Sequence, residues 1–312
     1  MGSIAVTSRS FSKHTFLRKE ILKLYPSAKF NDKGQILSGD SLVNFLKGYE
    51  KAIIALENID NKIIKQLPDL KVISKYGVGL DNIDLNALKK YGVKLGWTGG
   101  VNKRSVSELV ISFAISLLHK VIFANSEVKK GMWYQVRGRQ LSDCTVGVIG
   151  CGNIGKEVIK LLQPFNCKIL VNDIKKFPKF YEKYNITPVN LNKLIKTSDV
   201  ITLHLPLDNT TKNILNKKNL RLIKNDAVLI NLARGGLIDE IELKNLIIKK
   251  KLAGVALDVF EQEPPQDKEL LSLDNVLVTP HIGGSTEEAI IKMGMSAIEG
   301  LKKNKSADKY IK

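Results

Sequence analysis

Apolar residues in the first third of the chain form short runs that alternate with segments of helical spacing. The runs 4–7, 51–56 and 71–75 predict strands, because each is brief and rich in Ile, Val or Ala. Segments 41–46 and 61–66 are amphipathic and predict helices. Alternating strands and helices build a parallel sheet with helices on both faces, so the pattern predicts an α/β fold.

The same alternation continues through the rest of the chain, where further strands are expected at 146–149, 168–173, 200–205, 227–232, 254–258 and 276–279. One segment, 105–120, is apolar nearly all round and carries Ser105 and Glu108 at capping-box spacing. We expect it to be a helix buried on several sides. It can bridge two domains of one chain and also form an interface between two chains, and we expect both roles.

Three glycines follow the predicted strand at 146–149. Gly150 allows a sharp turn, Gly152 lets bare backbone approach a phosphate, and Gly155 lets the helix expected at 156–163 pack closely on its strand. Asp173 ends the next apolar run, 18 residues after Gly155, where a ribose needs a carboxylate acceptor. An ordinary glycine-rich connection does not explain this acid, so the pattern predicts a dinucleotide-binding unit.

Asp173 also indicates which dinucleotide is bound. Its carboxylate would repel the 2′-phosphate of NADP by about a few kcal/mol at contact distance, which favours NAD. Lys175 and Lys176 follow immediately and soften this exclusion.

Length and composition limit the remaining possibilities. With 312 residues the chain has room for two domains. It contains no apolar run long enough to span a membrane and no signal-peptide pattern, so we expect a soluble, cytoplasmic protein without a membrane partner. Its three cysteines show no metal-ligand spacing, so no metal site is expected.

The net charge of +18 raises the possibility of nucleic-acid binding. The lysines are scattered through every segment, and no basic stretch is interleaved with aromatic residues. We therefore interpret them as solvated surface charges and expect no nucleic-acid partner.

Three predicted strand ends carry unusual polar residues. Arg234 can bind a carboxylate through two parallel hydrogen bonds. His281 can take the proton of a hydroxyl group as the carbinol hydrogen leaves as a hydride. Glu263 can accept from the other ring nitrogen and fix the tautomer, although Glu261 on the same segment is an equal candidate by position alone. These groups suffice for the oxidation of a hydroxy acid, or for the reverse reduction of a ketone.

The order and spacing of these motifs resemble those of the D-isomer-specific 2-hydroxyacid dehydrogenases. The resemblance rests on the glycine loop and on segments 231–236, 258–264 and 279–284, and it spans nearly the whole chain. Segments 76–84 and 101–109 are similar to the 3-phosphoglycerate dehydrogenase branch of that family. The resemblance leads us to expect a short form without the C-terminal regulatory domain.

The resemblance implies two doubly wound parallel-sheet domains. A Rossmann NAD domain, 100–284, would be inserted into a flavodoxin-like substrate domain formed by 1–99 and 285–312. Arg234, Glu263 and His281 would be catalytic, and Asp258 would contact the nicotinamide carboxamide. The cofactor would also be lined by Gly150, Gly152, Asn153, Ile154, Gly155, Asp173, Leu205, Pro206, Leu232, Ala233, Gly283 and Gly284. The substrate would meet Lys75, Gly77, Val78, Gly79 and Asn102. His204 would pack near the cofactor.

The substrate is less well defined by the sequence. D-3-Phosphoglycerate, an intermediate of serine biosynthesis, is the first expectation, with glyoxylate, hydroxypyruvate or another D-2-hydroxy acid as the alternative. Members that act on phosphoglycerate often carry an Arg-Ser pair where this chain has Ile54-Ala55, which removes one phosphate ligand. Lys75 keeps a positive charge nearby, and Lys103 or Arg104 can compensate.

The resemblance also bears on assembly and leaves one different class of function open. A homodimer formed through the NAD domain is expected. A nonenzymatic NADH-responsive binding protein is the alternative class, because corepressors that resemble this family exist.

Overall fold

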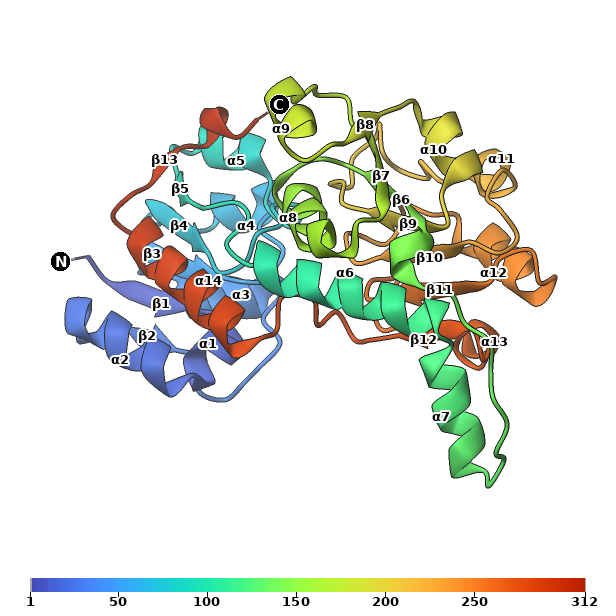
Figure 1. Cartoon of the computed structure of the whole chain (residues 1–312). Helices are drawn as coiled ribbons and strands as arrows, with labels where there is room; N and C mark the ends of the chain where they lie inside the picture. Colours follow the sequence, from blue (N-terminus) through green and yellow to red (C-terminus); the bar gives the residue numbers. More distant parts are fainter. Residues whose placement is uncertain (1, 312) are drawn as a thin grey trace. The chain divides into compact units, whose positions relative to one another are not determined.

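Two α/β units share the chain in the computed structural model, which describes residues 2–311 (Figure 1). The described residues up to Asn102 and those from Glu287 onward form unit 1, and Lys103–Thr286 form unit 2. The boundaries thus fall at 102/103 and 286/287, where the sequence analysis places them at 99/100 and 284/285. Unit 2 is inserted into unit 1 along the chain.

The sheet of unit 1 has the strand order β13-β5-β4-β3-β1-β2. Its strands are β1 (Ile4–Val6), β2 (Lys29–Phe30), β3 (Lys51–Ile54), β4 (Val72–Lys75), β5 (Lys94–Gly96) and β13 (Lys305–Ser306). The first five pair in parallel in the flavodoxin-like order 2-1-3-4-5, and only β13 is antiparallel to its neighbour. The predicted flavodoxin-like topology is therefore confirmed.

Helices cover both faces of this sheet. One buried cluster takes its apolar residues from α3 (Gly39–Leu46), α4 (Asn61–Lys65) and α5 (Leu85–Lys90), and the 3-10 turn η3 (Ala307–Lys309) joins it. The cluster on the other face uses α1 (Arg9–Lys13), α2 (Thr15–Leu24) and α14 (Glu287–Gly300). Because both faces are buried, β1 and β3 read as continuous apolar runs rather than as alternating patterns.

Unit 2 contains a seven-stranded parallel sheet in the order β12-β11-β10-β9-β6-β7-β8. Its strands are β6 (Thr145–Ile149), β7 (Lys168–Asn172), β8 (Thr187–Pro188), β9 (Val200–Leu203), β10 (Val228–Asn231), β11 (Gly254–Leu257) and β12 (Val276–Val278). Counted from β6, the order is 3-2-1-4-5-6-7, which is the dinucleotide-binding order with one extra strand. The order reverses between β6 and β9, and the carboxyl ends of those strands are where such sheets bind ligands.

Two apolar clusters also bury the faces of this second sheet. One contains α6 (Lys103–Leu118) and α8 (Asn153–Leu162), together with α9 (Pro178–Lys183) and the 3-10 turns η1 (Leu141–Asp143) and η2 (Gln163–Phe165). The other contains α10 (Leu191–Thr197), α11 (Lys217–Leu220), α12 (Glu240–Ile248) and α13 (Lys268–Leu271). The remaining helix, α7 (Val121–Lys129), has no buried residue.

The predicted strands are all present, and most end one or two residues earlier than expected, because the chain turns into loops at the carboxyl edge. The strands β2, β5, β8 and β13 are too short to show a period, so the sequence pattern does not predict them. The predicted capping box is wrong. The helix begins at Lys103, the Ser105 hydroxyl donates to the Gly283 carbonyl at 2.6 Å, and Glu108 pairs with Arg104.

Among residues 2–311, no single helix is long and apolar enough to cross a membrane. Only the bent pair α6 and α7 meets the length and composition test when the two are taken together.

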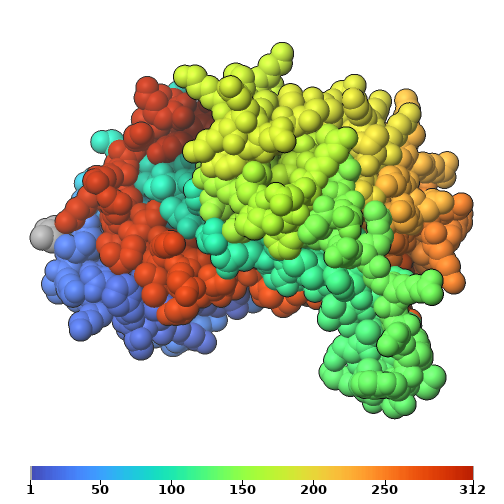
Figure 2. Space-filling view, in the orientation of Figure 1, coloured from blue at the N-terminus to red at the C-terminus, as the bar shows by residue number. Residues whose placement is uncertain are grey.

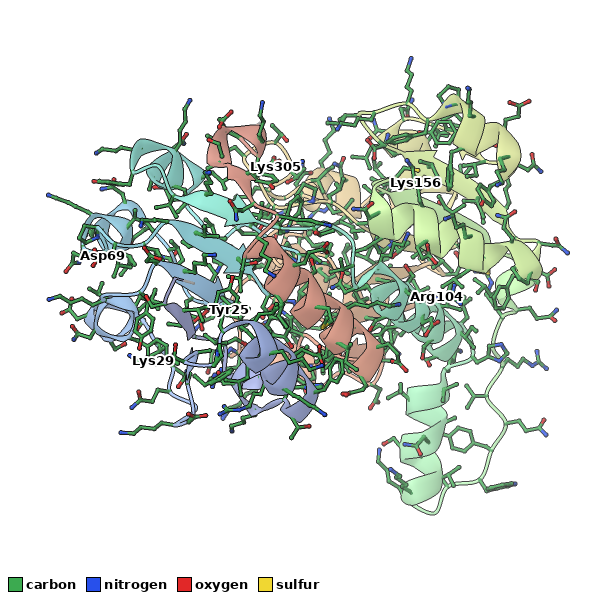
Figure 3. The ribbon with its side chains drawn as sticks, turned by 90° about the vertical axis from the view of Figure 1, so that its left-hand side faces the viewer. Tyr25, Lys29, Asp69, Arg104, Lys156 and Lys305 are labelled. Carbon is green, nitrogen blue, oxygen red and sulfur yellow. The ribbon has the colours of Figure 1, made fainter. Side chains whose placement is uncertain are left out.

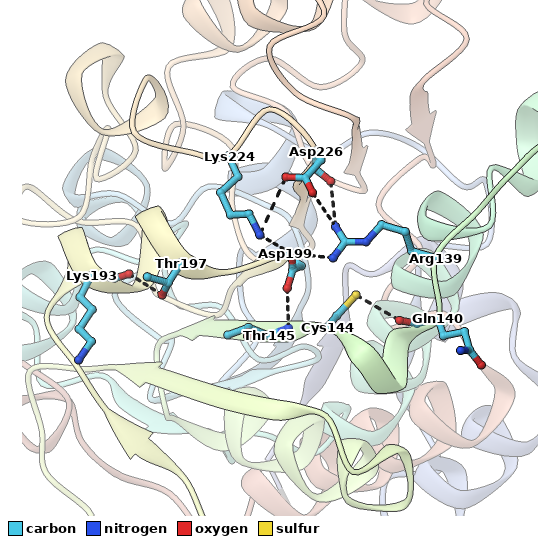
Figure 4. A network of polar contacts seen from close by, with 9 residues as sticks. All are labelled: Arg139, Gln140, Cys144, Thr145, Lys193, Thr197, Asp199, Lys224 and Asp226. Atoms are coloured by element: carbon cyan, nitrogen blue, oxygen red, sulfur yellow. Dashed lines mark hydrogen bonds and ion pairs between the residues drawn. The ribbon is translucent and has the colours of Figure 1, made fainter.

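An ionic network around the buried carboxylate of Asp199 lies at the amino ends of strands of unit 2 (Figure 4). The Asp199 carboxylate accepts from the Thr145 amide at 2.7 Å, from Arg139 at 2.8 Å and from Lys224 at 2.5 Å. Burial by itself would raise the pKa of Asp199, but the hydrogen bonds from Lys224, Thr145 and Arg139 outweigh burial and lower the pKa below its ordinary value. This edge of the sheet lies opposite the carboxyl ends that carry the predicted site.

We expect the substitution Asp199→Asn to lower the free energy of unfolding by about 2–3 kcal/mol at neutral pH, because it removes a charged acceptor from three hydrogen bonds. A lowered pKa in the folded state gives stability that is present above the ordinary pKa of aspartate and is lost as the pH falls through the folded value. The difference between variant and wild type should therefore shrink in acid.

Urea unfolding over a series of decreasing pH values measures this difference. Asp226→Asn is the control, because Asp226 also pairs with Arg139 but its side chain is 61% exposed. Equal losses for the two variants would contradict the assignment of the network to Asp199.

Candidate active site

The glycine loop after β6 is shaped by backbone contacts. Gly150 has φ 98°, and its amide donates to the Asn172 carbonyl at 2.8 Å, which joins the ends of β6 and β7. A Cβ at Gly155 would collide with the Gly150 carbonyl, so α8 packs as closely as the sequence analysis expects. A Cβ at Gly152 would meet no atom within 4 Å. The amino end of α8 therefore presents bare, exposed backbone, which is the arrangement that a pyrophosphate needs.

Asp173, directly after β7, is tied to this loop. One of its oxygens accepts from the Cys151 amide at 2.6 Å and the other from the Lys175 amide at 2.7 Å. Each carboxylate oxygen can accept a further hydrogen bond, so the acceptor for a ribose is retained. Lys156 on α8, labelled in Figure 3, lies 3.5 Å from the centre of the Phe177 ring and stabilises the segment that follows Asp173.

The other predicted cofactor residues lie at the ends of neighbouring strands of the same sheet. Gly152, Asn153 and Ile154 open α8, Leu205 and Pro206 follow β9, Leu232 and Ala233 follow β10, and Gly283 and Gly284 lie in the loop after β12. Parallel strands present all their carboxyl ends at one edge. The structure therefore gathers the predicted cofactor residues along one edge of unit 2.

Arg234 is held in a tight turn at the end of β10. The Asn231 side chain donates to the Arg234 carbonyl at 2.8 Å and accepts from the Ala233 amide at 3.1 Å. The guanidinium itself donates to the Ala233 carbonyl at 2.7 Å. Asn231 is buried, so it fixes the backbone from which Arg234 extends.

His281 and Glu263 form a direct pair. Nδ1 of His281 lies 2.8 Å from Oε2 of Glu263, and the other oxygen of Glu263 accepts from the Phe260 amide at 3.2 Å. An ionised Glu263 can only accept, so Nδ1 carries a hydrogen and Nε2 is the basic nitrogen. Both side chains are partly exposed, at 46% and 40%. The structure thus brings His281 together with Glu263 rather than with Glu261.

Asp258 supports the turn that carries His281. Its carboxylate is buried and accepts from the Thr279 hydroxyl at 2.5 Å and from the amides of Ile282 and Gly283, each at 2.7 Å. The family resemblance implies a nicotinamide contact for Asp258, and the sequence pattern does not predict this supporting role. An acid placed between two apolar residues at a strand end, Leu257 and Val259, is the signal that could have indicated it.

His204 lies under the glycine loop. Its Nε2 is 3.0 Å from the Thr202 hydroxyl, and its carbonyl contacts Gly150. Complete burial lowers the pKa of His204 to about 3, so the ring is neutral near neutral pH. This environment agrees with a packing role beside the cofactor loop.

The predicted substrate residues belong to unit 1. Lys75 ends β4, is buried, and donates to the Ala55 carbonyl and to the Asn82 side chain at 2.6 Å. Gly77, Val78 and Gly79 follow in one loop, in which the Val78 carbonyl accepts from the Trp97 indole at 3.0 Å. Asn102 is buried at the end of unit 1, and its side-chain oxygen has no hydrogen-bond partner.

An acidic side chain lies beside the end of β3. Glu57 accepts from the Ala55 amide at 2.6 Å, and Asn82 donates to the carbonyls of Ala55 and Glu57. Ile54, where phosphoglycerate enzymes often carry arginine, is completely buried. The loop after β3 therefore offers a carboxylate and no guanidinium.

The cations expected to compensate are engaged in ion pairs within unit 2. Lys103 lies 3.5 Å from Glu157, and Arg104, labelled in Figure 3, pairs with Glu108 at 2.6 Å and with Glu157 at 3.4 Å. Among residues 2–311, no cluster of three or more His, Cys, Asp or Glu side chains is suited to a metal ion.

A dinucleotide-binding sheet with Arg, Glu and His side chains at its strand ends defines a class: an NAD-dependent oxidoreductase built from two doubly wound units. The family model "D-isomer specific 2-hydroxyacid dehydrogenase, NAD binding domain" matches residues 111–283. The chain belongs to this family, and its unit 2 contains the family's NAD-binding domain.

Similar proteins differ in their named activities. The chain is 37% identical to the hydroxypyruvate reductase of Thermotoga maritima, over 84% of this chain and 87% of that protein. It is 38% identical to the D-3-phosphoglycerate dehydrogenase of Methanocaldococcus jannaschii over 78% of this chain, but it spans only 47% of that protein. A crystal structure of D-lactate dehydrogenase from Aquifex aeolicus with NAD and lactic acid has a TM-score of 0.85 at 28% identity, covering 96% of this chain and 94% of that one.

Proposed function

We propose that the protein transfers a hydride between NAD and a short, unphosphorylated D-2-hydroxy acid, using Arg234, Glu263 and His281. The 2.8 Å contact between His281 and Glu263 carries this proposal, because it gives the ring one fixed tautomer and a basic Nε2. Membership of the dehydrogenase family supports the same chemistry.

Each catalytic side chain has a distinct task. Arg234 binds the substrate carboxylate and orients the carbon that is oxidised, because its planar fork matches two carboxylate oxygens. His281 takes the hydroxyl proton during oxidation and returns it during reduction of the ketone. Glu263 holds the ring and stabilises it once it is protonated.

The residues of the glycine loop fit NAD. The exposed amino end of α8 would hold the pyrophosphate, and Asp173 would accept from the adenosine ribose. Asp258, which already accepts three hydrogen bonds, has capacity for one more, from the nicotinamide carboxamide. NAD, when bound, supplies the acceptor for the hydride.

The charges near the predicted substrate loop favour a substrate without a phosphate group. Glu57 contributes a carboxylate, Ile54 replaces the expected arginine, and Lys75 already donates to Ala55 and Asn82. The match to a hydroxypyruvate reductase over most of both chains agrees with a substrate such as hydroxypyruvate or glyoxylate. D-3-Phosphoglycerate is the second candidate, favoured by the match to the archaeal D-3-phosphoglycerate dehydrogenase.

We expect His281→Asn to lower kcat by about 10²–10⁴-fold, the usual contribution of a general acid or base. Asparagine suits the positive φ of 54° at this position, so the turn should persist. The loss should appear in both directions, because oxidation needs a base at this position and ketone reduction needs the same group as an acid.

Steady-state rates with NADH and hydroxypyruvate, and an NADH fluorescence titration, measure this effect. His119→Asn is the control, because His119 is an exposed residue outside the site. Binding of NADH without turnover of any D- or L-2-hydroxy acid by the wild type would instead support a nonenzymatic NADH-responsive protein.

The phosphate preference gives a second prediction. We expect the ratio of kcat/KM for D-3-phosphoglycerate to that for D-glycerate to be less than about tenfold, which is under roughly 1.4 kcal/mol of transition-state binding. Glu57→Gln keeps an acceptor for the Ala55 amide but removes the negative charge, so it should raise this ratio. A wild-type ratio well above tenfold would favour the phosphorylated substrate.

We further propose that the protein is a homodimer formed through unit 2. The segment 121–134 exposes a group of apolar side chains, Val121, Ile122, Val128, Met132, Trp133 and Tyr134, and Trp133 is 88% exposed. Figure 2 shows this segment, in green, projecting from the rest of unit 2. Exposed apolar patches of this kind mark protein–protein interfaces. The apolar surface is thus on α7 and its following loop, whereas the sequence analysis expected the interface on the preceding helix.

Light scattering after gel filtration should give twice the chain mass of 34.7 kDa for the wild type and a single chain mass for the double variant Ile122→Lys, Trp133→Ser. Ile36→Lys, a change at an exposed apolar residue of unit 1, should leave the mass unchanged. A monomeric wild type would refute this assembly.

A further inference from the structure

The turn that carries Arg234 packs directly against the turn 260–263, which carries Glu263. Gly235, directly after Arg234, packs against the peptide between Phe260 and Glu261, and a Cβ at Gly235 would collide with the Phe260 carbonyl and the Glu261 amide nitrogen. Because nothing separates the two backbones, the position of this peptide sets the distance between the two turns.

The two amides at this peptide have different carboxylate partners. The Phe260 amide donates to Glu263 at 3.2 Å, inside the turn that carries Glu263. The Glu261 amide donates to Oε1 of Glu240 at 2.7 Å. Glu240 is the first residue of α12, directly after the capping residue Asp239, so its backbone is anchored by a helix. The turn 260–263 is therefore held from another element by Glu240 and packs on Gly235, in addition to the contact of Glu263 with His281.

We propose that Glu240 is a positioning residue: by accepting from the Glu261 amide, it holds the turn 260–263 on the Arg234 turn and so sets the place at which Glu263 holds His281. This inference rests on the proposed function, because it assigns Glu263 and His281 to the chemistry.

The surroundings of Glu240 argue against a role in stability alone. Burial raises the pKa of Glu240, and the nearby carboxylates of Glu261, Asp267 and Glu263 raise it further, against the lowering effect of the Glu261 amide. A half-buried acid among like charges is an unfavourable choice for stability. As a hydrogen-bond acceptor for the Glu261 amide, in contrast, Glu240 keeps the turn that carries Glu263 in position.

Two substitutions of Glu240 separate the loss of the hydrogen-bond acceptor from the loss of the negative charge. Glu240→Ala removes the acceptor and should lower kcat by roughly ten- to hundredfold, the effect expected when a reacting group moves by about 1 Å. Glu240→Gln keeps an amide oxygen as acceptor and removes the charge, so it should retain kcat within about threefold of the wild type and should not lower the melting temperature. The Kd for NADH should stay within about twofold in both variants.

Glu242→Ala is the matched control on the same helix. Glu242 faces Arg221 at 2.7 Å and Lys217 at 3.8 Å rather than the Glu261 amide, so its loss should reduce stability and leave kcat within about twofold. If kcat fell in parallel with stability in both alanine variants, Glu240 would be merely structural and the proposal would be wrong.

A second readout does not depend on turnover. The chain has four histidines, so the ring signals of His281 can be assigned in an NMR spectrum by comparison with His281→Asn. Glu240→Ala should shift the His281 ring signals, whereas Glu240→Gln and Glu242→Ala should not.

The outcomes distinguish the two proposals. Unchanged His281 signals and kcat in Glu240→Ala overturn the positioning role, as does a Glu240→Gln variant that behaves like Glu240→Ala. A wild type without oxidoreductase activity defeats the proposed function. In that case a shift of the His281 signals in Glu240→Ala still supports the positioning of the turn.

Discussion

The buried carboxylate of Asp258 is the interaction on which the candidate site depends. It extends from the end of β11 and accepts three hydrogen bonds from the loop after β12, on which His281 lies. Hydrogen bonds to a charged acceptor contribute about 1.5–3 kcal/mol each, which offsets the several kcal/mol needed to bury the charge. Because Asp258 is rigidly placed by the sheet, the loop inherits a defined position, and His281 can meet Glu263 at hydrogen-bond distance.

The cofactor side of the site is built on the same principle. Asp173 at the end of β7 accepts from the Cys151 amide in the glycine loop, and Gly150 donates back to the last residue of β7. Reciprocal contacts between neighbouring strand ends hold the loop open for a phosphate without using a side chain there. In both parts of the candidate site, an aspartate at one strand end therefore accepts hydrogen bonds from the loop after a neighbouring strand: Asp173 from the glycine loop and Asp258 from the loop after β12.

The region of the predicted substrate residues, in unit 1, is built differently. At the end of β3, Ile54 is buried and Glu57 accepts a hydrogen bond from the Ala55 amide. The Lys75 ammonium group donates to the Ala55 carbonyl and to the side-chain oxygen of Asn82. The charged groups of this region make hydrogen bonds within unit 1, which is the basis of the proposal that the substrate carries no phosphate group. The Arg234 turn is held by Asn231, and the proposed function assigns its guanidinium to the substrate carboxylate.

The sequence by itself determined the alternation of strands and helices, the dinucleotide motif and the identity of Arg234, Glu263 and His281 as chemical candidates, because these features are local in the chain. It could not determine strands of two or three residues, such as β2 and β8, which exist only through pairing with a neighbour. It assigned Ser105 to a capping box, although tertiary packing directs that hydroxyl to Gly283. The contact of Glu263 with His281, the support from Asp258 and the contact of Glu240 were decided by tertiary structure, because each depends on atoms that are distant in sequence and meet only when the strand ends are aligned.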